Sequence, residues 1–148
     1  MVYDIKRFLD AQDNVYDIGY VTYDKALFEI KRGRKVSHWI WYVFPQLKHF
    51  GFSYNAKKYG IENLDEAREY YNNEILKYRL IEISEALLNV NDDNIMSIVG
   101  SIDAKKIKSC MTLFLEVDPD CNVFKDVLNR FYHGEKDTET LGILKGKA

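Results

Sequence analysis

The sequence of 148 residues has few of the cysteines and prolines, and none of the long apolar runs, that are features of disulfide-rich, multidomain and membrane proteins. It contains two cysteines, Cys110 and Cys121, and no CxxC pair, so neither a disulfide framework nor a cysteine-based metal site is indicated. Its two prolines, Pro45 and Pro119, stand outside any Ser/Gly-rich linker, and we expect residues 1–148 to form a single globular domain. No apolar run reaches the ~18 residues that a transmembrane helix requires. The charged N-terminal segment does not resemble a signal peptide, and we expect a cytoplasmic protein with no membrane partner.

No charge of one sign dominates, and no familiar ligand motif is present. The 21 basic residues are balanced by 23 acidic ones, which disfavours nucleic acid as a partner. The three histidines, His38, His49 and His133, lack HxxxH or HExxH spacing, so we expect no metal and no cofactor. The sequence has no Gly-rich phosphate loop and no GxSxG motif, and it leaves open both the oligomeric state and whether the protein is an enzyme.

Apolar residues instead recur at helical spacing through most of the chain, which predicts a mainly α-helical bundle with no substantial sheet. Capping residues support three of the starts, namely Asp4, Asn63 with Glu66 three residues on, and Asp137, and a further helix is expected to start near Thr22. About seven helices are predicted, over residues 5–12, 22–33, 63–72, 76–90, 103–117, 124–134 and 137–144.

The aromatic residues are concentrated in one segment, because residues 39–59 hold 8 of the 21 rings. The apolar run over residues 36–44 has strand propensity, yet no other segment reads as a strand to pair with it. We therefore favour a buried helix ended by Pro45, with His38 and Trp41 on one face. Trp39 and Phe44 are predicted to lie in the core.

Polar side chains interleave with these rings in a way that a purely apolar core would not need. Arg34 and Lys35 would pair with phosphate, and His38 is the candidate catalytic residue because an imidazole transfers protons near neutral pH. A nucleotide-like or phosphorylated small molecule of the ADP-ribose or NAD type is the predicted ligand. The predicted ligand-binding residues are Arg34, Lys35, Ser37, Trp41, Gln46, Tyr59, Lys106, Ser109 and Thr112.

Two other interpretations remain open at this point. In the first, the segment has only a structural role. His38 and Gln46 would then be buried hydrogen-bond partners for Trp and Tyr donors, and Arg34 and Lys35 would lie at the solvated end of a helix. In the second interpretation the protein is a non-enzymatic protein-interaction module. Its exposed recognition loop would comprise Phe50, Phe52 and Tyr54 flanked by Lys48, Lys57 and Lys58.

The string Gly-Arg-Lys-x-Ser-His-Trp-x-Trp-x-x-Phe-Pro-Gln over residues 33–46 is long and specific. Together with Arg7-Phe8 and the Lys106 to Phe114 segment, it resembles the bacterial and fungal family known as domain of unknown function 1810, over residues 4–144. The resemblance implies a compact helical domain but no particular activity. Some members carry a calpastatin label, which a chain with 47% hydrophobic residues contradicts, because calpastatin is disordered.

A weaker resemblance connects the same segment to the NADAR proteins, which act on N-glycosidic ADP-ribose. They also place a histidine beside aromatic residues, but a glutamate precedes that histidine where this chain has Ser37. The resemblance therefore implies a nucleotide-like ligand without implying a shared reaction.

Overall fold

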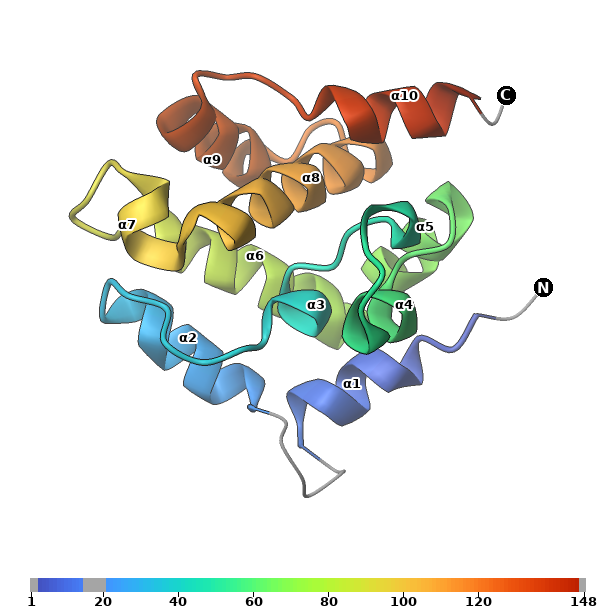
Figure 1. Ribbon diagram of the computed structural model, residues 1–148, viewed down its shortest axis with the longest axis horizontal. Coiled ribbons are helices and arrows are strands. Elements are labelled where there is room, and N and C mark those ends of the chain that lie inside the picture. The colour runs from blue at the N-terminus through green and yellow to red at the C-terminus, as the bar shows by residue number, and fades with distance from the viewer. Residues whose placement is uncertain (1–2, 15–20, 147–148) are drawn as a thin grey trace.

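The computed structural model describes residues 3–14 and 21–146, and this part of the chain is mainly α-helical, as predicted (Figure 1). Within it lie ten α-helices, one 3-10 helix and no β-strand. The elements are α1 (Lys6–Gln12), α2 (Tyr23–Lys31), α3 (Ile40–Val43), η1 (Lys48–Phe50), α4 (Tyr54–Tyr59), α5 (Leu64–Asn72), α6 (Glu74–Leu88), α7 (Ile95–Val99), α8 (Ser101–Val117), α9 (Asn122–Tyr132) and α10 (Thr138–Gly146). The predicted count of seven was too low, because α3, α4 and α7 are too short to show a helical period.

The longest helix, α8, runs through the middle of the molecule and packs against α5, α7, α9 and α10 (Figure 1). Its predicted apolar stripe of Ile107, Met111 and Phe114 is fully buried. Helix α6 packs against α2, α5 and α9. The polar edge of α8 is therefore the part of the helix that remains available to a site. Among the described residues, no helix has the length and apolar character needed to cross a membrane.

Local capping chemistry sets most helix starts as predicted. The side chains of Thr22, Asn63 and Asp137 each accept a hydrogen bond from a backbone N–H in the first turn of α2, α5 and α10. Asp4 was wrong as a cap, because α1 starts after Ile5 and makes no side-chain capping bond. The backbone carbonyl of Asp4 accepts a hydrogen bond from Arg7 instead, at 2.6 Å.

The segment over residues 36–44 is neither a strand nor one continuous helix. Only Ile40–Val43 is helical, so the predicted shared helical face of His38 and Trp41 was wrong. Residues 36–39 form a bent, non-helical stretch beside Glu29, a buried carboxylate of α2 with 3% exposure. The hydrogen bonds to this carboxylate explain why the helix starts late, since Val36, Ser37 and Trp39 all donate to it.

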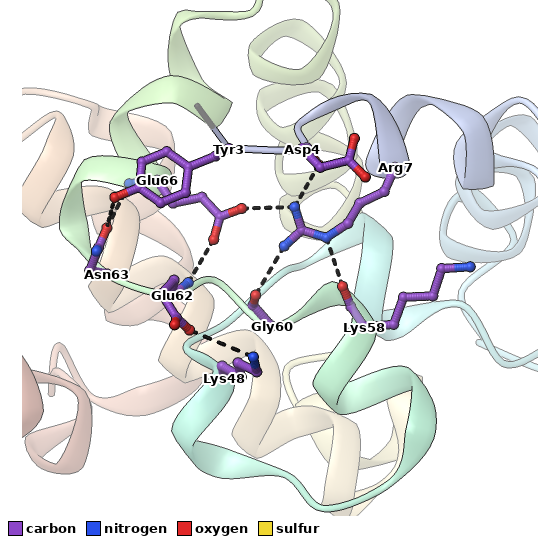
Figure 2. A network of polar contacts seen from close by, with 9 residues as sticks. All are labelled: Tyr3, Asp4, Arg7, Lys48, Lys58, Gly60, Glu62, Asn63 and Glu66. Carbon is purple, nitrogen blue, oxygen red and sulfur yellow. Dashed lines mark hydrogen bonds and ion pairs between the residues drawn. The ribbon is translucent and has the colours of Figure 1, made fainter. Parts of the chain in front are cut away.

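A buried ion pair between Arg7 and Glu66 fixes the chain after α4 (Figure 2). The Arg7 guanidinium donates to Glu66 Oε2 at 2.8 Å, and to the carbonyl oxygens of Lys58 at 2.7 Å and Gly60 at 3.0 Å. The other oxygen of Glu66 accepts from Glu62 N at 2.7 Å. Because these carbonyls lie on either side of Tyr59, Arg7 determines where Tyr59 and Gly60 sit.

Candidate functional site

Two adjoining cavities lie between α8 and the segment around α3 and α4. The larger, called here the outer pocket, has a volume of about 520 Å³, within the range of small-molecule sites. It is lined by Gln46, Phe50, Ile102, Lys105, Lys106, Lys108, Ser109, Asp137 and Glu139. The inner hollow has a volume of about 10 Å³ and is lined by Ile40, Trp41, Phe44, Gln46, Ala56, Tyr59, Gly60 and Lys106. Gln46 and Lys106 line both, so the two spaces adjoin.

Three lysines of α8 give the outer pocket its cationic character. Lys105 forms no ion pair with any described residue. The Lys106 ammonium is 4.0 Å from Asp103 Oδ1 and 5.3 Å from the centre of the Trp41 ring. Lys108 is 6.0 Å from the centre of the Tyr132 ring. Because none of these ammonium groups is closely paired, all three are available to an anionic ligand.

Of the two carboxylates that line the outer pocket, that of Asp137 already accepts hydrogen bonds from within the protein. Asp137 Oδ2 accepts from Ser109 Oγ at 2.9 Å and from Thr140 Oγ1 at 2.5 Å. Thr112 Oγ1 accepts from the Asp137 backbone N–H at 2.8 Å and donates to the carbonyl oxygen of Lys108 at 2.9 Å. These bonds attach the start of α10 to α8. Thr112 is fully buried and therefore outside the pocket, while Ser109 contributes to its wall.

The structure brings five of the ten predicted site residues to the two cavities. Trp41 and Tyr59 line the inner hollow, Ser109 lines the outer pocket, and Gln46 and Lys106 line both. The side-chain amide of Gln46 makes no hydrogen bond to another described residue. Trp39 and Phe44 are fully buried, as predicted. Aromatic rings and polar side chains from separate parts of the chain therefore meet at these cavities.

The cations and the hydroxyl that precede Trp39 lie elsewhere. Lys35 Nζ is 2.7 Å from Asp103 Oδ2 and donates to the carbonyl oxygen of Ser37 at 2.6 Å, so its charge is already neutralised. Ser37 Oγ donates to Glu29 Oε2 at 2.6 Å. Arg34 and His38 are exposed and line neither cavity. The role of His38 in proton transfer stays a prediction.

Glu29 of α2 orders this segment and could not be picked out from the sequence. Burial alone would raise the pKa of its carboxyl group, but hydrogen bonds from Ser37, Trp39 and Val36 outweigh burial and lower that pKa to about 2. The carboxylate is therefore charged at neutral pH. Nothing local to residue 29 marks it, because its partners lie seven to ten residues further along the chain. Lys105 and Lys108 also line the outer pocket and were not among the predicted ligand-binding residues, although both are close to Lys106 in the sequence of the same predicted helix.

Comparison with known proteins agrees with the sequence resemblance. A family profile described as "Protein of unknown function (DUF1810)" matches residues 2–144. The chain belongs to the DUF1810 family. A crystal structure of the conserved hypothetical protein Rv1873 from Mycobacterium tuberculosis is similar to this DUF1810 chain, with 36% identity, a TM-score of 0.88 and 97% of each chain covered. No curated protein matches it.

The family string now has a structural explanation in this DUF1810 protein. Lys35, Ser37 and Trp39 all bind carboxylates inside the fold, namely Asp103 and Glu29. Trp41 and Gln46, at the other end of the string, line the cavities. The first half of the string therefore builds the loop, and the second half contributes to the candidate site.

Proposed function

We propose that this DUF1810 protein binds an anionic, nucleotide-like or phosphorylated small molecule in the outer pocket. The observation that supports this is a cavity of about 520 Å³ in which three loosely paired lysines lie beside apolar side chains. Lysines bind phosphate oxygens, while Phe50 and Ile102 offer a surface for a planar ring. Glu139, in the first turn of α10, can accept hydrogen bonds from sugar hydroxyl groups.

Thermal denaturation with ADP-ribose, NAD and AMP tests the proposal. At a concentration about 100 times its Kd, a ligand stabilises a protein by about 2.7 kcal/mol, and we expect the Tm to rise by about 5–10 °C. The double variant Lys105→Gln/Lys108→Gln should lose most of this rise. We expect His38→Ala to keep the rise, because His38 lines neither cavity. A loss of turnover in that variant without a loss of binding would identify His38 as catalytic.

The matched control is Lys25→Gln/Lys125→Gln, which removes the same charge from exposed positions on α2 and α9. This control should respond to ligand like the wild type. The proposal fails if none of the three compounds raises the wild-type Tm, or if the control variant loses the rise as completely as the pocket variant does.

A second candidate function, a protein-interaction module, is favoured by the exposure of two rings. Phe52 and Tyr54 are 89% and 73% exposed, between η1 and the start of α4. Backbone hydrogen bonds from Lys48 N to Ile61 O and from Ile61 N to Gln46 O, both 2.8 Å, close this loop at its base. Compact loops with closed ends are often functional.

The interaction hypothesis predicts a loss of partner without a loss of stability. We expect Phe52→Ala to change the free energy of unfolding by less than about 0.5 kcal/mol, because the ring is exposed. In affinity purification from native extract, a partner recovered with the wild type should be missing with Phe52→Ala. Phe28→Ala, at a ring of α2 that is 58% exposed, is the matched control and should retain it. Equal recovery with both variants would contradict this function.

A further inference from the structure

We infer that the inner hollow is a subsite for one oxygen atom of the bound molecule, which accepts a hydrogen bond from the Trp41 indole N–H beside the Lys106 ammonium. The inference rests on the proposed function of the outer pocket and adds to it the place and the chemistry of one ligand contact. The oxygen would belong to a phosphate, carboxylate or carbonyl group, because the Trp41 indole and the Lys106 ammonium can only donate hydrogen bonds.

The first observation is a buried donor without an acceptor. Trp41 Nε1 is inaccessible to solvent and has no hydrogen-bond partner among residues 3–14 and 21–146. A buried donor that is left unpaired has lost its hydrogen bonds to water without a replacement, so proteins rarely keep one without a reason. Trp39 shows the usual arrangement two residues earlier, where Nε1 donates to Glu29 Oε1 at 2.9 Å.

The second observation is the size and lining of the hollow that Trp41 borders. A volume of about 10 Å³ accommodates one oxygen-sized group and nothing larger. The Lys106 ammonium is 5.3 Å from the centre of the Trp41 ring. Its carboxylate partner, Asp103 Oδ1, is as far away as 4.0 Å, so much of the Lys106 charge is available. Gln46 adds an amide without a described partner. An oxygen with negative charge would satisfy these groups together.

The third observation is that the hollow adjoins the outer pocket and has fixed walls. Lys106 and Gln46 belong to both linings, so a ligand in the outer pocket can extend one atom inward. Arg7 holds the carbonyls of Lys58 and Gly60 on either side of Tyr59, which lines the hollow together with Trp41. A side chain at Gly60 would meet the Lys48 Cα at 2.5 Å, which leaves this wall no room to vary. Such a preformed site binds with little loss of conformational entropy.

The two tryptophans make the test direct. A ¹H–¹⁵N spectrum of the protein contains two indole N–H signals, and Trp41→Phe identifies the one from Trp41. On titration with ADP-ribose, and separately with inorganic pyrophosphate, the Trp41 signal should shift and saturate at the concentration that raises the Tm. The Trp39 signal should stay in place, because its donor is already bound to Glu29. Trp41→Phe keeps a ring but lacks the N–H, and we expect it to weaken binding about tenfold.

The outcomes separate this inference from the function on which it rests. If a compound raises the Tm and shifts the backbone signals of Lys105 and Lys108 but not the Trp41 indole, the subsite is wrong and the outer pocket stands. Unchanged affinity in Trp41→Phe would also overturn the subsite, as would a bound-water signal at the Trp41 N–H that persists at saturation. If neither compound changes the Tm or any signal, both proposals fail.

Discussion

Replacing Glu29 with glutamine is expected to lower the free energy of unfolding by about 3 kcal/mol, and the Tm by about 10 °C. The carboxylate accepts four hydrogen bonds of 2.6–3.0 Å from Val36, Ser37 and Trp39, and it is buried. A glutamine side chain has one acceptor oxygen and places an amide N–H₂ against donors that need an acceptor. The variant therefore leaves buried donors unsatisfied, and residues 36–39 lose the group that orders them.

Urea denaturation of the wild type and the variant measures this loss. Glu69→Gln is the matched control, since Glu69 is exposed on α5 and makes no ion pair with a described residue. That control should stay within about 0.5 kcal/mol of the wild type. If Glu29→Gln were as stable as Glu69→Gln, the network around Glu29 would contribute nothing to folding.

The stabilisation by Glu29 should depend on pH in a defined direction. In the folded protein its pKa is lowered from 4.5 to about 2, so as the pH falls the unfolded chain binds this proton first. The contribution is fully present above about pH 5 and disappears as the pH falls towards 2. With 1.36 kcal/mol per pKa unit, the difference between wild type and Glu29→Gln at neutral pH should be about 3 kcal/mol and should close at low pH. A difference that stayed constant with pH would contradict the role of the charge.

Replacing Arg7 with lysine is expected to cost about 2–4 kcal/mol of unfolding free energy, although the charge is kept. The guanidinium donates to Glu66 and to three backbone carbonyls, those of Asp4, Lys58 and Gly60, from one planar group (Figure 2). A lysine ammonium is a single point with three donors and cannot reach acceptors on opposite sides. Buried carbonyl groups and part of the charge on Glu66 would therefore lose their partner.

Arg68→Lys provides the matched control in the same assay. Arg68 pairs with Asp65 at 2.9 Å, three residues away on the exposed side of α5, where an ion pair contributes less than about 1 kcal/mol. Arg7→Lys and Arg68→Lys make the same chemical change, so their difference in urea midpoint measures the buried network alone. Equal midpoints would show that the Arg7 geometry does not stabilise the fold.

Arg7 and Glu29 also support the candidate site, because each positions a different part of the lining of the inner hollow. Arg7 positions Tyr59 and Gly60, and Glu29 positions the loop that leads into Trp41. Although neither residue lines a cavity, Arg7→Lys and Glu29→Gln should therefore weaken ligand binding together with stability. Variants at Lys105 and Lys108 should weaken binding alone, because these side chains make no buried contact with a carboxylate.

Features with a short-range cause could be predicted from the sequence. Thr22, Asn63 and Asp137 cap helices because each side chain bonds to a backbone N–H a few residues ahead. The stripe of Ile107, Met111 and Phe114 follows from the helical period and is buried as expected. Asp4 failed as a cap because Arg7, three residues ahead, bonds to its backbone while contacting Glu66, far along the chain.

By itself, the sequence determined the helical class, most helix boundaries and the family, because these depend on neighbours a few residues apart. Only the tertiary structure decided which polar residues are free for a ligand. In the loop after α2, Lys35 meets Asp103 of α8 and Ser37 donates back to Glu29 of α2, and neither residue lines the two cavities. The packing of the chain also places Trp41 and Gln46 beside Lys106, sixty residues or more further along the chain. Charge pairing across such separations depends on the folded backbone, and sequence spacing does not encode it.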